Sequence, residues 1–209
     1  VTPFDKRRSK VLISEDFAFV LYNGEIRRYH IEEGAELTEE RYRQILNEVL
    51  RKRARERAIY LLKEKDRTEA ELTKKLREGF YPEEVIREVL ELFKARHYID
   101  DEEYGRRYLD NHSQKKSRRR LQYDLQRKGL NRDQIEELLE EIEVPEEDQI
   151  REFLQKKGYD PEQTDQKEKG KLMMALARKG FAYEAIRSVM GEWLDTQNAV
   201  SYCLTPSRC

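Results

Sequence analysis

One helical pattern occurs three times in the sequence, and this internal repeat limits the fold more than any other feature. Each copy has two leucines four residues apart, then a glycine and an apolar residue, and an isoleucine six or seven residues after the glycine. The copies begin at Leu72, Leu121 and Leu172. A unit of about 45 residues is too small to bury a core alone, so the pattern predicts units stacked in tandem.

Helix start and stop signals divide each unit into three short helices. Thr68 and Glu71 have the spacing of a capping box, and Gly79, Gly129 and Gly180 suit helix C-termini. The expected helices are 53–64, 69–78 and 82–96, then 101–113, 117–128 and 132–142, then 146–157, 165–179 and 182–194. They are preceded by a long helix from about Glu39 to Lys65.

The N-terminal segment has a different composition, rich in β-branched and aromatic residues from Lys10 to Ile31. Asn23-Gly24 favours a tight type I′ turn between two strands. The segment therefore predicts a β-hairpin or a three-stranded sheet that packs on the helices, because a lone hairpin is marginally stable.

These elements define a mostly α fold of tandem three-helix repeats in an elongated, curved array, with a small N-terminal β-hairpin or sheet. The expected segments are a hairpin region at 1–37, a long helix with the first repeat at 38–99, the second repeat at 100–144, the third repeat at 145–195 and a disordered tail at 196–209. Such arrays present long exposed faces that bind other macromolecules.

The overall composition is that of a helical protein with a thin core. Charged residues make up 41% of the 209 residues, the formal net charge is −1, and the two signs alternate along most of the chain. No apolar run approaches the ~20 residues of a membrane span, and the N-terminal stretch has no apolar signal core. We expect a soluble, cytoplasmic monomer that makes no membrane contact. Cys203 and Cys209 are the only cysteines, and we expect reduced thiols on the tail.

Positive charge is concentrated in the stretch from Lys115 to Leu130, which has seven basic residues and one acid. If residues 115–128 form one helix with Leu121 at 0°, Leu125 lies near 40° on the core side. Six side chains then share the opposite arc, between roughly 120° and 260°: Lys115, Lys116, Arg119, Arg120, Tyr123 and Arg127. Arg118 and Lys128 add charge beside this basic stripe.

The third repeat carries cations at the same offsets from its first leucine. Lys116, Arg120, Arg127 and Lys128 of the second repeat correspond to Lys167, Lys171, Arg178 and Lys179, whereas the first repeat keeps only Arg67. A charged helix face is often only a solvated surface, but this repetition favours a surface that binds a polyanion or an acidic protein groove. Nothing in the stripe discriminates bases, so we expect salt-dependent contacts to phosphates or carboxylates.

The sequence contains none of the common catalytic motifs. His30, His97 and His112 are scattered, and there is no glycine-rich phosphate loop, nucleophile elbow or His-Glu-x-x-His helix. We therefore expect a protein that is not an enzyme, with no cofactor and no metal site.

Three motifs resemble the RecX family of regulatory proteins. Arg67-Thr68 through Leu76 is similar to that family's "r-t-x-x-E-L-x-x-K-L" helix, and the stretch from His97 through Tyr104 is similar to its "G-Y-[IL]-[ND]-D-x-x-[FY]" element. The third-repeat "RKGFAYEAI" resembles "R-K-G-[FI]-x-x-x-x-I". The resemblance covers about residues 10–195. His97 and Ser117 stand where glycine is usual, and the tail from Thr196 has no counterpart.

The resemblance implies a regulator of DNA repair and homologous recombination. RecX proteins bind the filament that RecA recombinase forms on single-stranded DNA, lie along its groove and damp its ATPase and strand exchange. On this view the basic stripe and its third-repeat counterpart bind the filament, and the protein meets DNA through it. The alternatives left open are a direct nucleic-acid binder that needs no RecA and a passive helical adaptor for another protein.

Overall fold

The computed structural model describes residues 1–14 and 16–191 of the chain. The chain divides into two compact units, Val1–Tyr104 and Gly105–Cys209. The tail at 196–209, with Cys203 and Cys209, lies outside the described residues. No helix in the described ranges is long and apolar enough to cross a membrane.

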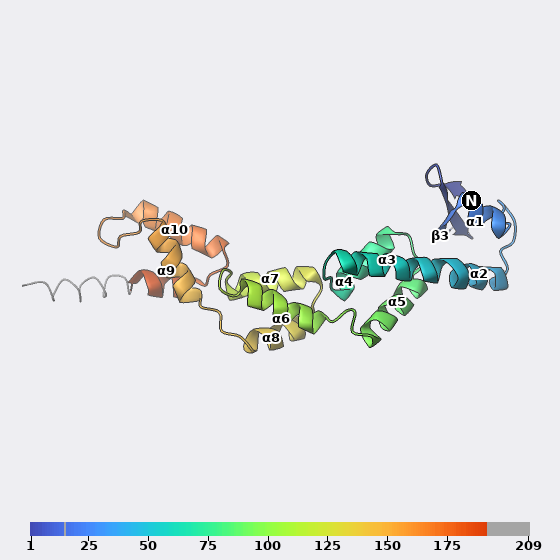
Figure 1. The fold of residues 1–209 in the computed structure, drawn as a ribbon. Helices are drawn as coiled ribbons and strands as arrows, with labels where there is room; N and C mark the ends of the chain where they lie inside the picture. The colour runs from blue at the N-terminus through green and yellow to red at the C-terminus, as the bar shows by residue number, and fades with distance from the viewer. Residues whose placement is uncertain (15, 192–209) are drawn as a thin grey trace, which may run out of the picture. The chain divides into compact units, whose positions relative to one another are not determined.

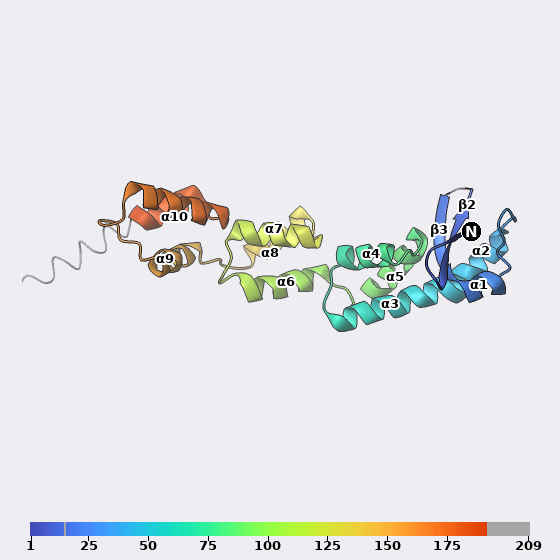
Figure 2. The same cartoon turned by 90° about the horizontal axis from the view of Figure 1, so that it is seen from above.

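A three-stranded antiparallel sheet begins the N-terminal unit. Strands β1 (Thr2–Pro3), β2 (Arg8–Ile13) and β3 (Asp16–Tyr22) pair in that order, with Ile13 opposite Asp16. Phe19 and Leu21 of β3 are fully buried in one core with Ile45 and Leu46. Figure 2 shows the sheet standing beside α2 in this unit. The predicted N-terminal sheet is therefore confirmed and packs on the helices that follow, but it extends from Thr2 to Tyr22 rather than from Lys10 to Ile31.

The predicted turn at Asn23-Gly24 was wrong, because these residues begin helix α1 (Asn23–Arg28). The backbone N–H of Tyr22 donates to Glu25 Oε2 at 2.8 Å, which caps the start of the helix. Asn23 Oδ1 accepts a hydrogen bond from Ser9 Oγ on β2. These contacts stabilise a helix where the dipeptide alone favours a turn.

The helices of the first repeat follow a continuous helical run. Helix α2 (Glu39–Ile45), a π-helical turn η1 (Leu46–Leu50) and α3 (Arg51–Glu64) form the predicted long helix. Helices α4 (Glu69–Glu78) and α5 (Glu83–Ala95) complete the repeat. Thr68 caps α4 by accepting the Glu71 N–H at 3.2 Å, as the sequence predicted.

The second unit contains the other two repeats (Figure 1). Helices α6 (Asp101–His112), α7 (Arg118–Lys128) and α8 (Arg132–Glu140) form the second repeat, although α6 begins in the first unit. Helices α9 (Glu146–Lys156), α10 (Gln166–Arg178) and the helical residues 183–191 form the third. Inside the described ranges, every boundary of these helices lies within two residues of its prediction.

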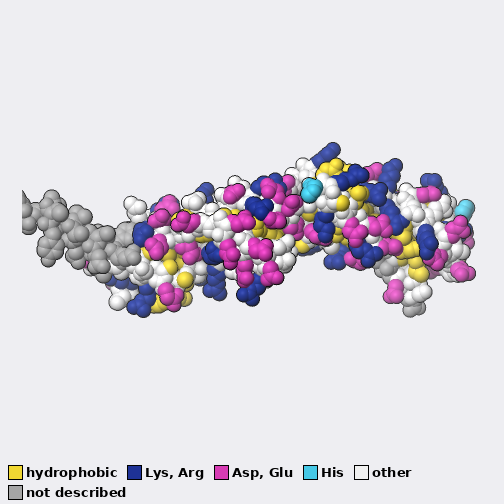
Figure 3. Space-filling model, turned by 90° about the horizontal axis from the view of Figure 1, so that it is seen from below, with side chains coloured by type: hydrophobic (Ala, Val, Ile, Leu, Met, Phe, Trp, Pro, Cys, Tyr) yellow, Lys and Arg dark blue, Asp and Glu magenta, His cyan; other side chains and the backbone are white. Residues whose placement is uncertain are grey.

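The leucines of the repeat face the interior, as the periodicity requires. Leu121 and Leu125 are completely buried, and so are Leu72 and Leu76 in the first repeat. In the third repeat Leu176 is buried in a separate cluster with Ile150, Phe181 and Ile186. Charged side chains of both signs are interleaved on the face drawn in Figure 3.

The middle helices of the three repeats end in the same way. Four residues after the second leucine the backbone is left-handed, with φ 63° at Phe80, 101° at Gly129 and 98° at Gly180. The next residue's N–H then bonds the carbonyl of that leucine. Phe80, rather than Gly79, is therefore the structural counterpart of the other two glycines. This backbone costs a non-glycine residue roughly 1–2 kcal/mol.

Candidate functional site

The basic stripe is divided between a turn and a helix. Helix α7 begins at Arg118, because the Ser117 side chain accepts the Arg120 N–H at 3.2 Å and caps the helix there. Lys115 and Lys116 lie in the turn that follows α6. Placing these two lysines on the helix was therefore wrong, and their predicted wheel positions do not apply.

The stripe residues within α7 lie on its exposed side. Arg119, Arg120 and Arg127 are exposed, and Tyr123 is 50% exposed. The guanidinium groups of Arg120 and Arg127 lie 5.4 and 5.8 Å from the Tyr123 ring centroid, close enough for cation–π attraction. The helix therefore presents an aromatic ring between two cations to solvent.

Lys116 belongs to a half-buried hydrogen-bonded cluster. Its Nζ donates to Asp124 Oδ2 at 2.8 Å and to the Tyr108 hydroxyl at 2.7 Å, and the same hydroxyl donates to Asp124 at 3.0 Å. Burial lowers the pKa of Lys116, but its bonds to Asp124 and Tyr108 outweigh burial and leave the pKa raised. Burial raises the pKa of Asp124, and the bonds from Lys116 and Tyr108 leave it lowered overall. This lysine therefore remains charged and partly neutralised by Asp124.

Arg118 also has a structural role. Its Nη1 donates to the Leu139 carbonyl of α8 at 2.8 Å, and its backbone N–H donates to Glu146 Oε1 at 2.8 Å. These contacts join α7 to the end of the second repeat and the start of the third. Arg118 lies at 60° on the predicted wheel, toward the core, which agrees with this inward contact.

The start of α7 meets the end of α10. Ser117 Oγ donates to the Lys179 carbonyl at 2.9 Å. A Cβ built on Gly180 would come within 2.6 Å of Ser117 Oγ. The glycine therefore allows the close approach of the two repeats. This contact brings the N-terminal cations of one basic helix to the C-terminal cations of the next.

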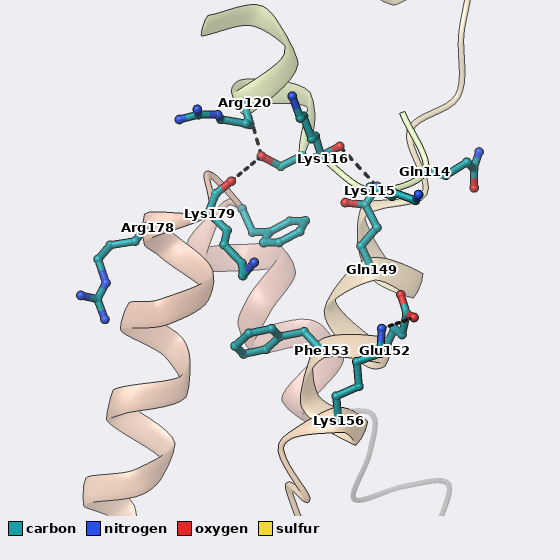
Figure 4. Close-up of a pocket in the computed structure, with 12 residues that line it drawn as sticks. Gln114, Lys115, Lys116, Arg120, Gln149, Glu152, Phe153, Lys156, Arg178 and Lys179 are labelled. Atoms are coloured by element: carbon teal, nitrogen blue, oxygen red, sulfur yellow. Dashed lines mark hydrogen bonds and ion pairs between the residues drawn. The ribbon is translucent and has the colours of Figure 1, made fainter. Parts of the chain in front are cut away.

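A cavity of about 500 Å³ lies at this contact (Figure 4). Cations from both repeats line it: Lys115, Lys116, Arg120, Lys156, Arg178 and Lys179. Its single acidic residue, Glu152, is paired with Lys156 at 2.5 Å. Phe153 and Phe181 supply apolar surface. An excess of cations around a hollow concentrates positive potential and attracts anions.

Gln149 lines the cavity and contains a buried, unsatisfied acceptor. The residue is 8% exposed, and its Nε2 donates to the carbonyls of Ser113 at 2.8 Å and Lys116 at 3.3 Å. Its Oε1 is buried without a hydrogen-bond partner in the described ranges. Figure 4 shows this side chain beside Lys116, at the edge of the cavity. A buried carbonyl without a hydrogen-bond partner costs folding free energy, so this oxygen is a local weak point of the packing.

The structure gathers five of the predicted site residues in this cavity and leaves the others outside its lining. Those inside are Lys115, Lys116, Arg120, Arg178 and Lys179. Those outside are Arg118, Arg119, Tyr123, Arg127, Lys128, Lys167 and Lys171. The basic residues at matching positions of the second and third repeats therefore do not form one continuous surface. The start of α7 meets the end of α10, so matching positions are brought to different places.

Sequence reasoning missed Lys156, Gln149, Phe153 and Phe181. Lys156 was detectable in part, since it ends an amphipathic helix beside another lysine. Gln149 and the two aromatic residues follow the ordinary pattern of a core face, and only their position against α7 distinguishes them. In the described ranges no group of His, Cys, Asp and Glu could hold a metal ion.

Comparison with known proteins supports the repeat assignment. Sequence models of the first, second and third three-helix domains of RecX match residues 54–91, 100–139 and 145–190. The chain is 32% identical over 183 residues to the regulatory protein RecX of Caldanaerobacter subterraneus subsp. tengcongensis, covering 86% of this chain and 90% of that one. It is 25% identical over 192 residues to the regulatory protein RecX of Clostridioides difficile, covering 90% of both chains.

Two solved structures share the fold. A crystal structure of the regulatory protein RecX aligns with a TM-score of 0.60 at 21% identity, over 90% of this chain and 95% of that one. RecX from Lactobacillus salivarius aligns with a TM-score of 0.57 at 20% identity, over 68% of this chain and 96% of that one. The three domain matches in order, together with the relative at 32% identity, show that the chain belongs to the RecX family of regulatory proteins.

Proposed function

We propose that this protein regulates a RecA recombinase by binding the filament that RecA forms on single-stranded DNA. Binding lowers the ATPase and strand-exchange activity of the filament, and so restrains homologous recombination and repair. The protein acts as a monomer in the cytoplasm, through binding and without a reaction of its own. Its membership of a family of regulatory proteins supports a regulatory role.

The observation that carries this proposal is the convergence of cations from two repeats on one cavity. Of the seven charged lining residues, six are basic, and the single acid is already paired with Lys156. Lys115 and Arg178 make no ion pair with any residue in the described ranges. Free cations beside a hollow favour a bound phosphate or carboxylate, and both groups occur on a nucleoprotein filament.

The exposed side of α7 extends this surface in the proposal. Arg119, Tyr123 and Arg127 add cations and an aromatic ring beyond the cavity, and Lys128 adds further charge nearby. Lys167 and Lys171 are exposed on α10 and form a separate basic segment. Both regions suit a long, repetitive partner better than a small molecule, because each contributes weak contacts over a wide area.

The proposal is tested by titrating the protein into a RecA reaction that hydrolyses ATP in the presence of single-stranded DNA. We expect the ATPase to be inhibited at protein concentrations below that of RecA. Lys115→Glu with Arg178→Glu should raise the concentration for half-inhibition about tenfold, which corresponds to ~1.4 kcal/mol. The reason is that two favourable contacts become repulsive.

The matched control is Lys63→Glu with Lys65→Glu, which makes the same change in net charge on exposed residues of the first unit. It should leave inhibition unchanged. A third variant, Lys167→Glu with Lys171→Glu, measures the contribution of the separate α10 segment. An unchanged half-inhibition concentration for the cavity variant would refute the assignment of the cavity.

The main rival is direct binding to nucleic acid without RecA, and the charge of the cavity also favours it. This rival predicts an unchanged RecA ATPase together with strong binding to naked DNA that weakens steeply with salt. The proposal predicts the reverse, with inhibition at concentrations where naked DNA is largely unbound. A passive adaptor would show neither effect.

A further inference from the structure

A second basic cavity lies in the N-terminal unit, where the sheet meets the first repeat. Its volume is about 450 Å³. It is lined by strands β2 and β3, helix α3 and the end of α4, through Arg8, Val20, Tyr22, Arg53, Arg57, Lys75, Glu78, Gly79, Phe80 and Tyr81. It is separate from the cavity described above, because every lining residue belongs to the first compact unit.

Four cations line this cavity, and they are not equally neutralised. Arg8 pairs with Asp5 at 2.7 Å, Lys75 pairs with Glu78 at 2.6 Å, and Arg53 pairs with Glu25. Arg57 makes no ion pair within the part of the chain that the structure describes, and its guanidinium lies 5.3 Å from the Tyr60 ring centroid. Lys10 adds a further charge, 5.7 Å from the centroid of the Phe80 ring. The rim is therefore net positive.

Aromatic rings are interleaved with these cations. Tyr22 is 45% exposed, and the Arg53 guanidinium lies 4.7 Å from its ring centroid. Phe80 packs edge-on against Phe4, with ring centroids 4.7 Å apart. Tyr81 lies beside them, with burial as the main cause of its raised pKa. The cavity thus combines flat apolar faces with positive charge at its rim.

The backbone of Phe80 is strained, at a position where the other two repeats have glycine. Its φ of 63° is the left-handed conformation that the second and third repeats give to Gly129 and Gly180. Glycine adopts this conformation without steric cost, whereas phenylalanine does not. Strain of this kind persists where the surrounding structure over-determines it, and it clusters at functional sites. In this repeat an aromatic side chain stands at the position where glycine would relieve the strain.

We propose that this cavity binds single-stranded DNA directly, as a second site independent of the cavity in the other unit. Arg57, with Arg8 and Lys75, contacts backbone phosphates, and Tyr22 and Phe80 stack against unpaired bases. A positively charged groove with aromatic stacking faces is the general means of binding single strands without sequence preference. A duplex keeps its base faces covered, and an acidic peptide would use the cations but leave the rings unoccupied.

The test measures binding of the full chain to a fluorescein-labelled oligothymidylate of about 20 nucleotides, without RecA, by fluorescence anisotropy. Omitting RecA separates this test from that of the proposed function. Arg57→Glu should weaken binding about fivefold or more and reduce the slope of log K against log salt by about 0.7 for each phosphate that the protein no longer neutralises. Tyr22→Leu should weaken binding about tenfold with little change in that slope, because stacking carries no charge.

Arg55→Glu is the matched control. Arg55 is exposed on the same helix, lies about 200° around it from Arg57, and does not line the cavity. Arg55→Glu makes the same change in net charge as Arg57→Glu. If Arg57 acts through a local contact rather than through the overall charge of the protein, Arg55→Glu should weaken DNA binding less than about twofold. Equal losses of affinity for the two variants would overturn the proposal.

A second measurement needs no substitution. Oligonucleotides containing 5-iododeoxyuridine are photo-crosslinked to the unmodified protein, and the crosslinked peptides are identified by mass spectrometry. We expect crosslinks in the peptides that contain Tyr22 or Phe80, and their absence would overturn the stacking contact. Poly-glutamate that binds in an Arg57-dependent but Tyr22-independent manner, with no crosslink at either ring, would assign the surface to an acidic protein instead.

Discussion

Ser117 joins the two repeats of the C-terminal unit, and its removal gives the most quantitative test of this structure. The residue is 1% exposed. Its Oγ accepts the Arg120 N–H at 3.2 Å, as the N-cap of α7, and donates to the Lys179 carbonyl at 2.9 Å. One side-chain atom therefore stabilises a helix start and a contact between residues 62 positions apart.

Ser117→Ala removes both hydrogen bonds. Loss of an N-cap costs about 1 kcal/mol, and loss of a buried hydrogen bond costs about another 1 kcal/mol. Ser117→Gly removes the same bond to Lys179 but weakens the cap by only a few tenths of a kcal/mol, because glycine is tolerated at that position. We therefore expect the free energy of unfolding to fall by about 2 kcal/mol for Ser117→Ala and by just over ~1 kcal/mol for Ser117→Gly.

The assay is urea denaturation followed by far-ultraviolet circular dichroism, with hydrogen exchange of peptides from α7 and α10 to isolate the C-terminal unit. The two compact units need not unfold together, so the local measurement is essential. If Ser117→Gly is as stable as the unmodified protein, the hydrogen bond to Lys179 contributes nothing to stability. Equal losses of stability for the two variants would refute the capping role.

Three further predictions concern single residues. His97→Gly should stabilise the first unit to urea by about 1 kcal/mol, because His97 is exposed with a φ of 53°; a decrease in stability would refute the strain argument. The pKa of Asp124 is lowered in the folded state. The contribution of this carboxylate to the free energy of unfolding is therefore present above about pH 4 and is lost as the pH falls further. Asp124→Asn should show a smaller loss of stability between pH 6 and pH 3, and an unchanged loss would contradict this reasoning. Burial and the bond to Glu84 raise the pKa of Tyr42 to about 12. The contribution of Tyr42 to stability is therefore present below about pH 10 and is lost as the pH rises toward 12. Tyr42→Phe should remove this loss of stability in alkaline denaturation, and an unaltered loss would exclude Tyr42 as its source.

The positions of the helices could be predicted from the sequence because their causes are local. Leucine spacing specifies the buried face of each middle helix, and Leu121 and Leu125 are buried as expected. Side chains at Thr68 and Ser117 cap their own helices through bonds to residues three positions away. Such interactions depend on neighbours in the chain, so the sequence contains the whole signal.

The prediction of a turn at Asn23-Gly24 was wrong because other contacts outweigh the local turn propensity there. Glu25 caps the helix start, and the Ser9 hydroxyl on a neighbouring strand bonds Asn23. The assignment of Gly79 as counterpart of Gly129 failed for a related reason. Only the backbone dihedral angles show that Phe80 takes the left-handed position one residue later.

The candidate site shows most clearly which features follow from local sequence and which depend on tertiary packing. The sequence alone identified two basic helices at matched offsets and the exposed side of α7. Tertiary structure decided that the start of α7 meets the end of α10, so Lys115 and Arg120 share a cavity with Arg178 while Arg119 and Lys171 lie outside its lining. The pairing depends on the Ser117–Lys179 bond and on the close approach that Gly180 permits. Contacts between residues so far apart in the chain leave no periodic trace in a single sequence, and only the packed structure shows them.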